Sequence, residues 1–352
     1  MRKRFVYFGG NRMKTRVLAA LCLLAGVVLA VTTAQAQVVE LKLSSWVPPK
    51  HPLNADGFPL WAKSIEAESK GTLKVTIFPA QQLGQAKDHY DMARDGIADF
   101  TYVNPGYTPG RFPIIAGGEL PFLFSNAKDG SKALDEWYRP YAKTEMKDVH
   151  YCFAYVHDPG TLHAKKEIKR PDQLKGMKIR PANGTIANLV ALNGGASVQV
   201  SAPEAREALE TGVADAITFP WNSIYLFGID RSVKFHMDAP FYVTTFVHVM
   251  SPGTYAKLNA NQKKVIDNHC TSDWAKKVAE GWATWESEGR TKMMADKGHT
   301  VYSLSADDVK AWRASAKPLR DEWAASVKKA GGDPDKAMSG LESTLKKFNS
   351  AY

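Results

Sequence analysis

Short strand-like runs alternate with runs of helical spacing between residues 38 and 250, and this alternation most constrains the fold. Strands are predicted at 38–45, 73–78, 98–103, 149–156, 177–179, 197–200, 215–219 and 241–250. Helices are predicted at 54–69, 88–95, 128–143, 186–192 and 203–210, and later at 252–258, 260–295, 305–330 and 335–348. Strands that alternate with helices indicate mostly parallel sheets with helices on both faces. The fold class is therefore α/β, with long helices in the last third.

The length of the chain favours two domains. Its 352 residues exceed one comfortable doubly wound domain, even without the first 36. There is no long Gly/Ser linker in the sequence. Two domains without such a linker predict a hinge and a ligand cleft between them.

The N-terminus has the pattern of a cleavable signal peptide over residues 1–36. Basic residues precede an apolar run of 15 residues, 17–31, which is shorter than the roughly 20 that span a membrane. A small-x-small site ends at Ala36, so the mature chain is expected to begin at Gln37 in the periplasm, with Met1 or Met13 as the start. The six basic residues of this segment leave a formal charge of +4 for the rest, which does not favour a nucleic-acid partner.

Cysteine usage is sparse after the signal peptide. Cys152 lies in a strand-like run and Cys270 near a predicted helix end. Export permits a disulfide, but two cysteines make no disulfide scaffold, so two buried free thiols are the favoured state.

Four predicted strands end in a large or polar side chain beside a proline turn: Trp46, Asn104, Arg180, and Phe219 followed by Trp221. Arg180 precedes a proline, which favours extended geometry and places it at the end of its strand. Ligands of open α/β sheets bind beyond the carboxyl ends of strands. A guanidinium there can pair with a carboxylate through two hydrogen bonds. We expect the four ends to converge on one small-molecule cleft.

Signals of catalysis are weak. The sequence has no nucleophile elbow, phosphate loop, dinucleotide fingerprint or zinc-protease motif. Its nine histidines show no metal-ligand spacing, and His157 and His163 are the pair nearest to the Arg180 region. No catalytic residue, metal or cofactor is therefore predicted, although an exported enzyme acting on a carboxylate stays an alternative.

Several motifs together resemble the periplasmic solute-binding proteins of TRAP (tripartite ATP-independent periplasmic) transporters, of the dicarboxylate-binding type. Their order and spacing carry the resemblance over the whole mature chain: Gln82-Leu83-Gly84, Asp95-Gly96-Ile97-Ala98-Asp99-Phe100, Glu119-Leu120-Pro121-Phe122, the run from Leu174 to Arg180, and Ala214-Asp215-Ala216, where the family usually has glycine at the last position.

The resemblance implies two α/β domains of the periplasmic-binding-protein kind, joined by a hinge and a long helix. One domain would comprise residues 37–157 with about 243–285, and the other 158–242 with about 286–352. It also implies that Arg180 pairs with a ligand carboxylate. Trp46, Asn104 and Phe219 stand at positions where sialic-acid-binding relatives have three polar residues. Gly160-Thr161 stands where those relatives have a second arginine.

A less polar pocket implies a small, 2-oxo or hydroxy, or aromatic monocarboxylate in place of a sugar acid. The predicted ligand-binding set is Arg180, Asn104, Trp46, Phe219, Trp221, Asn222, Glu119 and Tyr102. The implied partners are the small and large TRAP membrane subunits, with the protein as a monomer and a dimer left open. A carboxylate-binding protein that serves a sensor or an ATP-driven importer is the nearest alternative.

Overall fold

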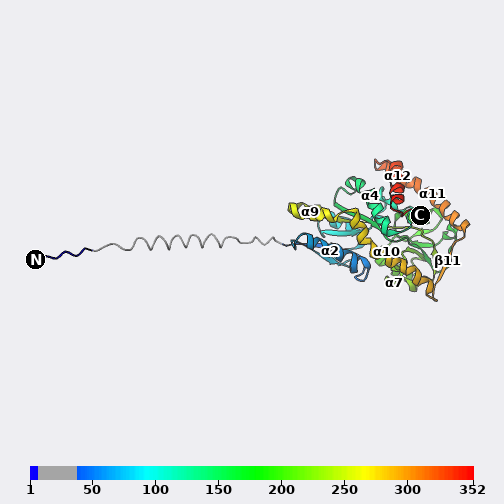
Figure 1. Ribbon diagram of the computed structural model, residues 1–352. Helices are drawn as coiled ribbons and strands as arrows, with labels where there is room; N and C mark the ends of the chain where they lie inside the picture. Colours follow the sequence, from blue (N-terminus) through cyan, green and yellow to red (C-terminus); the bar gives the residue numbers. More distant parts are fainter. Residues whose placement is uncertain (7–37) are drawn as a thin grey trace. The chain divides into compact units, whose positions relative to one another are not determined.

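The computed structural model describes residues 1–6 and 38–352. The apolar run and the cleavage site of the predicted signal peptide lie outside these residues. Residues Val39–Tyr352 form one compact unit that contains two β-sheets flanked by helices (Figure 1). None of the helices in the described residues is both long and apolar enough to cross a membrane.

The first sheet has five strands in the order β2-β1-β3-β10-β4. They are β1 (Val39–Ser44), β2 (Leu73–Phe78), β3 (Phe100–Val103), β4 (His150–Val156) and β10 (Thr245–Met250). β1 is parallel to β2 and β3, whereas β10 is antiparallel to both β3 and β4. The connecting helices are α2 (Phe58–Glu68), preceded by a π-helical turn at Leu53–Gly57, α3 (His89–Arg94) and α4 (Ala127–Glu145).

The second sheet has six strands in the order β11-β9-β5-β8-β6-β7. They are β5 (Thr161–Ala164), β6 (Lys178–Arg180), β7 (Ala196–Ser197), β8 (Ala216–Phe219), β9 (Phe235–Asp238) and β11 (Thr300–Ser303). β5 is antiparallel to both of its neighbours, and the other pairs are parallel. The helices between these strands are α5 (Gly184–Leu192), α6 (Ala202–Glu210) and α7 (Ser223–Leu226).

Both sheets are mixed, so the expectation of mostly parallel sheets is only partly right. Two segments, which we call the passing segments, connect β4 to β5 and β9 to β10 without a helix. A strand that follows such a connection need not run parallel to its neighbours, because it lacks the helical crossover that usually joins parallel strands. The two passing segments lie side by side, because Gly160 and Tyr242 form an antiparallel bridge. The amide of Gly160 donates to the carbonyl of Tyr242 at 2.9 Å.

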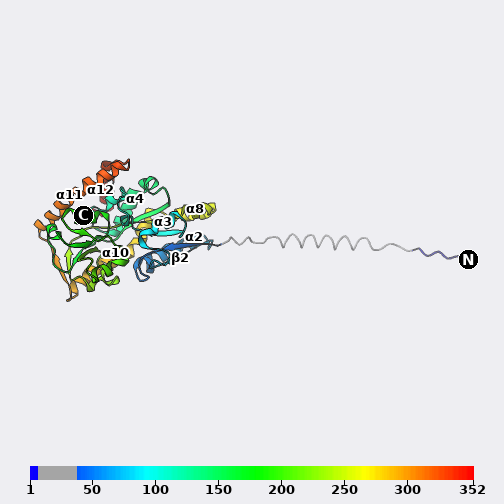
Figure 2. The ribbon, with the colours of Figure 1, turned by 180° about the vertical axis from the view of Figure 1, so that it is seen from behind.

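The last third is helical, as predicted, with α8 (Pro252–Lys257), α9 (Ala260–His269), α10 (Ser272–Ala295), α11 (Ala306–Lys329) and α12 (Pro334–Lys347). α10 contacts α4 and β4 of the first half and β11 of the second. α12 packs on α4 (Figures 1 and 2), where the indole of Trp137 donates to the carbonyl of Ala337 at 2.7 Å. Both α10 and α12 therefore join parts that are far apart in the sequence.

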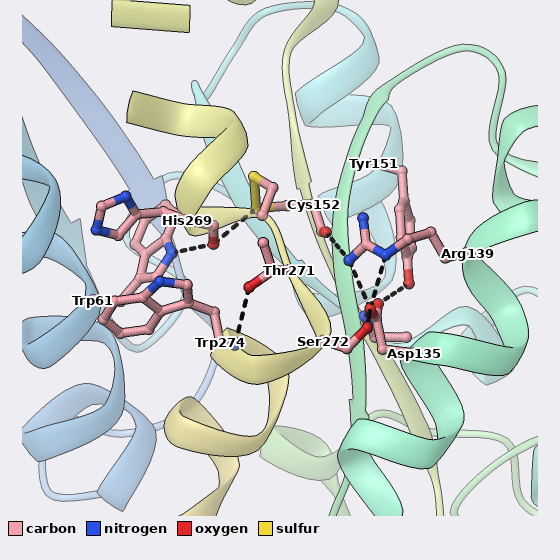
Figure 3. Close-up of polar contacts among 11 residues, drawn as sticks. Trp61, Asp135, Arg139, Tyr151, Cys152, His269, Thr271, Ser272 and Trp274 are labelled. Atoms are coloured by element: carbon pink, nitrogen blue, oxygen red, sulfur yellow. Dashed lines mark hydrogen bonds and ion pairs between the residues drawn. A yellow bond between two sulfur atoms is a disulfide. The ribbon is translucent and has the colours of Figure 1, made fainter. Parts of the chain in front are cut away.

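The single helix predicted over 260–295 is wrong, because α9 and α10 are separate. The break follows His269, and the side chain of Thr271 caps α10 by accepting from the amide of Trp274. At the start of α10, the Ser272 hydroxyl donates to buried Asp135 of α4 at 2.6 Å (Figure 3). Asp135 also accepts from Arg139 and from the backbone amide of Ala154, so one carboxylate holds α4, β4 and α10 together.

The favoured free thiols are also wrong, since Cys152 and Cys270 form a disulfide (Figure 3). The break between α9 and α10 brings Cys270 against β4, which the separation of 118 residues hides in the sequence. The Cys152 sulfur lies 3.8 Å from the carbonyl oxygen of His269. This is a contact and not a hydrogen bond, because a disulfide sulfur carries no proton.

His248 of β10 is buried among aromatic rings, and neither of its ring nitrogens has a hydrogen-bond partner in the described part of the chain. It stacks on Phe100 and Phe153 with ring centroids 5.5 and 5.0 Å away. A buried polar group without a partner costs about 1–3 kcal/mol. We therefore expect His248→Phe to raise the unfolding free energy by about 1 kcal/mol in denaturant titrations at pH 7.5.

Phenylalanine is larger than histidine, and overpacking could offset this gain. His248→Leu, which adds less volume, separates the two effects. A lower unfolding free energy in both variants would mean that His248 has a hydrogen-bond partner in solution, and would contradict the prediction.

Candidate functional site

A pocket lies between the two sheets and encloses about 360 Å³, its mouth included. The first half contributes Trp46, His51, Asn104, Tyr107 and His157; the second half contributes Arg180, Phe219 and Phe227; Tyr242, Thr244, Phe246 and Trp282 come from the second passing segment, β10 and α10.

Arg180 ends β6 and, among the residues that the structure describes, is the only charged side chain that lines this pocket. It is 1% exposed and forms no ion pair with a carboxylate of the described residues; its charge adds only in a minor way to the lowered pKa of Glu204, which is due mainly to the hydrogen bond from Ser201. Its Nε donates to the carbonyl of Val200 at 3.0 Å, and two longer contacts of 3.5 Å reach the Thr218 carbonyl and the Tyr107 hydroxyl. A buried charge normally needs a partner of opposite sign, so the pocket is prepared for an anion.

Aromatic rings form the walls around this cation. The Trp46 ring stacks on Tyr102 at 4.8 Å, and its indole nitrogen donates to the Tyr102 carbonyl at 3.0 Å. The Phe219 ring lies 5.6 Å from the Arg180 guanidinium carbon. Phe246 completes the wall, with its ring 6.3 Å from Trp46. Such walls favour an apolar or aromatic ligand body.

Neutral polar groups also reach the pocket. Asn104 uses its side-chain oxygen to cap the following turn, accepting from the amide of Gly106 at 2.9 Å. His157 accepts from the amide of Thr244 at Nε2, so its Nδ1 carries the proton and donates to the Asp158 carbonyl. Burial lowers the pKa of His157 to about 4, which keeps it neutral.

The buried hydroxyl of Tyr242 makes no hydrogen bond of normal geometry with the described residues, although the Thr218 side chain lies close enough to lower its pKa. Burial raises the pKa of this phenol, and the nearby charge of Arg180 lowers it. A Cβ at Gly160 would lie 3.0 Å from the hydroxyl oxygen and 2.9 Å from the ring. The Tyr242 ring thus fills the space beside position 160.

A chain of three histidines supports the pocket wall from behind. His163 Nε2 donates to the Phe219 carbonyl at 3.0 Å, and its Nδ1 lies 2.7 Å from Nδ1 of His236. His236 Nε2 lies 2.8 Å from Nδ1 of His299. Burial lowers the pKa of His163 to about 4 and of His236 to about 2, so both are neutral and each proton position is fixed by the next acceptor.

The sequence pattern of bacterial extracellular solute-binding proteins, family 7, matches residues 43–326. The chain belongs to this family. Among solved structures, a TRAP solute-binding protein from Rhodoferax ferrireducens T118 with copurified benzoate is 28% identical, with a TM-score of 0.83 over 89% of this chain and 99% of that one.

Two further structures are similar to this solute-binding protein. A marine metagenome TRAP protein specific for aromatic acids, crystallised with 3-hydroxybenzoate, is 32% identical, with a TM-score of 0.82 over 89% of this chain and 99% of that one. A Bordetella bronchiseptica protein with bound (R)- and (S)-mandelate is 27% identical, with a TM-score of 0.83 over 88% and 99%. The likeness confirms the predicted fold of two α/β halves.

The structure brings four of the predicted site residues together: Trp46, Asn104, Arg180 and Phe219 line one pocket of this solute-binding protein. The strand-end argument placed them there. Their contact with a ligand stays a prediction.

The other four predicted residues do not line this pocket. Tyr102 lies behind Trp46, and Trp221 packs edge-on against His163 at 5.4 Å. Glu119 accepts from the amide of Thr245 and lines a separate cavity, and burial raises its pKa to about 8.

Asn222 serves to hold the loop after β8 on α10. The backbone amides of Asn222 and Ser223 donate to the buried carboxylate of Glu286 at 2.6 and 3.1 Å. The indole of Trp282 donates to the same carboxylate at 2.8 Å. Burial raises the pKa of Glu286 to about 7. A side chain at Gly289 would collide with the backbone of Asn222. The loop that follows Phe219 is therefore fixed to the long helix.

Sequence reasoning missed His51, Tyr107, Tyr242, Phe246 and Trp282 as pocket residues. Tyr242 and Phe246 fall in the run that is predicted as a buried strand. Tyr242 in fact precedes β10, in the segment that connects β9 to β10, and the sequence does not reveal that it faces the pocket. Trp282 is one of several apolar positions on α10, and its place depends on how that helix crosses both halves. His51 follows the Trp46 turn, whose proline pair was the only local signal.

Proposed function

We propose that this protein captures an aromatic or small monocarboxylate between its two sheets and delivers it to TRAP membrane subunits. One observation carries the proposal: Arg180 is a buried cation that pairs with no carboxylate of the described residues, and it lines a pocket whose walls are aromatic. A ligand carboxylate would supply the missing charge, and an apolar ligand body would fit the remaining space.

Three relatives support the aromatic choice, since their structures contain benzoate, 3-hydroxybenzoate and mandelate. The pocket of this chain suits such ligands, because among the described residues its lining holds one cation and no second charged side chain. A dicarboxylate or sugar acid would leave charges or hydroxyls against aromatic rings, which costs free energy.

Capture would proceed by closure of the two halves on the ligand. The guanidinium of Arg180 would bind the carboxylate through two hydrogen bonds, and the hydroxyl of Tyr242, which also lines the pocket, could add a third. Water leaves the pocket on closure, and the ion pair strengthens as the local dielectric falls. The passing segments near 157–160 and 239–244 are the proposed hinge between the domains set out above.

The membrane partners and the cellular location are part of this proposal. Periplasmic export agrees with the family and with the N-terminal pattern of the sequence. Delivery to a sensor or an ATP-driven importer is the alternative, and the identity of neighbouring genes distinguishes these partners. Catalysis on the bound acid would appear as product after incubation.

Thermal unfolding against a panel of carboxylates tests the function. A ligand at about 1,000 times its Kd stabilises the folded state by about 4 kcal/mol, which raises Tm by several degrees. We expect shifts with benzoate, hydroxybenzoates, mandelate or small 2-oxo acids, and none with glucuronate or succinate. The protein should first be unfolded, dialysed and refolded to remove copurified ligand. A response confined to sugar acids or dicarboxylates would contradict the proposal.

A further inference from the structure

We infer that His51 donates a hydrogen bond to a neutral oxygen on the ligand, separate from the carboxylate that Arg180 binds. This inference rests on the proposed function and narrows it to acids that carry a hydroxyl or a similar oxygen, such as hydroxylated aromatic acids. His51 would then be a residue that determines specificity, distinct from the Arg180 anchor.

The proton of His51 has a fixed position. The backbone amide of Leu53 donates to its Nδ1 at 3.2 Å, so Nδ1 is an acceptor and carries no proton. Burial lowers the pKa of His51 to about 3, and the ring is neutral near pH 7. A neutral imidazole with an acceptor Nδ1 must carry its proton on Nε2. His51 is therefore a hydrogen-bond donor through Nε2.

The donor has no acceptor within residues 38–352. His51 is 1% exposed and lines the ligand pocket, and no hydrogen bond to its Nε2 is formed by the described residues. Its ring stands edge-on to Trp282, with centroids 4.8 Å apart and planes at 63°. His51 Nε2 is not among the fully buried side-chain atoms that lack a hydrogen-bond partner, so it reaches the open space of the pocket, where a ligand oxygen can accept its hydrogen bond.

The type of oxygen follows from the charges around the pocket. Arg180 is the only charged side chain in the lining, and His51, His157, Tyr107 and Tyr242 are the other titratable groups there. A second carboxylate near His51 would therefore lack a cation. A neutral hydroxyl or carbonyl oxygen needs only the Nε2–H donor.

The positions of the two groups in the fold extend this argument. His51 belongs to the segment between β1 and α2 of the first half, whereas Arg180 ends β6 in the second half. An acid that contacts both would join the two halves directly. The hydroxyl would thus contribute to the closed state, and its loss would weaken binding without removing the carboxylate anchor.

Calorimetry with matched ligand pairs tests this role. Each hydroxybenzoate (2-, 3- and 4-) is compared with the benzoate that carries a methyl group on the same ring carbon. The two have a similar shape, but the methyl group cannot accept a hydrogen bond. For at least one pair we expect the wild-type protein to bind the hydroxyl compound about 10- to 100-fold more tightly than its methyl counterpart. This is the range expected where a site recognises a ligand hydroxyl through a buried hydrogen bond.

Two variants of His51 form a matched set. His51→Asn keeps an acceptor near Nδ1 for the Leu53 amide but has no donor at the Nε2 position, whereas His51→Gln keeps a donor near Nε2. The preference should fall to about threefold or less in His51→Asn and should be partly retained in His51→Gln. The ratio between paired ligands is the readout, because general damage to the pocket would weaken both members equally.

The inference is overturned if wild type shows no hydroxyl preference in any pair, or if the preference survives in His51→Asn. Both outcomes leave the proposed function intact as long as the monocarboxylates bind. Absence of binding by every monocarboxylate tested would overturn the proposed function, and the inference with it.

Discussion

Arg180→Lys is expected to weaken the binding of the best monocarboxylate by at least about 100-fold, which corresponds to about 2.7 kcal/mol. The Arg180 guanidinium is held in place by the Val200 carbonyl through Nε, which leaves its terminal nitrogens for the ligand. Lysine offers one point charge on a flexible stem and cannot form the two parallel hydrogen bonds of a guanidinium with a carboxylate. Calorimetry of refolded protein measures the change.

Arg206→Lys is the matched control. Arg206 is a surface residue of α6 that pairs with Glu210 four positions later, and it does not line the pocket. Its replacement should leave both affinity and Tm unchanged within error. Affinity close to wild type in Arg180→Lys would remove Arg180 as the anchor. Equal losses in both variants would point to a general effect of charge and not to the pocket.

The sequence allowed prediction of the part of the site that local chemistry determines. Arg180 could be placed at a strand end because Pro181 follows it, and Trp46, Asn104 and Phe219 stand beside similar turns. The structure puts all four in one pocket. The strand β2 and the capped start of α6 at Ser201 were likewise visible as an alternating run and a capping box.

What the sequence hid depends on contacts between distant segments. β5, β9 and β11 have only four residues each and exist because they pair with one another or with β8. The disulfide depends on the break between α9 and α10, but the apolar periodicity of the sequence continues across that break and predicts one helix. Trp221 and Asn222 follow the right strand end, but they turn away to His163 and Glu286. Distance along the chain from a predicted site is therefore a poor guide to contact with it.

Acidification from pH 6.5 to 4.5 is expected to remove several kcal/mol of unfolding free energy. Burial lowers the pKa of six histidines to about 4 or below: His51, His89, His157, His163, His236 and His248. The unfolded chain binds protons at these groups near pH 6.5, whereas the folded protein does not. Their stabilising contribution is therefore present above pH 6.5 and is lost as the pH falls toward the folded pKa values.

Buried carboxyls oppose this trend in part. Burial raises the pKa of Glu119 to about 8, of Glu286 to about 7 and of Asp158 to about 6, and it also raises the pKa of Glu145. These four groups bind protons in the folded state first, so they favour folding as the pH falls. Burial also lowers the pKa of His150, His269 and His299. The histidines therefore outweigh the four carboxyls, and unfolding takes up at least about two protons, which lowers stability by about 3 kcal/mol per pH unit or more.

Denaturant titrations at pH 7.5, 6.5, 5.5 and 4.5 measure this slope, and His248→Phe is the internal control. His248 lies outside the pocket, and its replacement removes one of the six histidines. The slope should then fall by about 1.4 kcal/mol per pH unit, the value for one proton. Stability that stays flat down to pH 5 would show that the buried histidines keep nearly ordinary pKa values. The neutral state assigned to His51 and to the histidine chain would then have to be abandoned for that pH range.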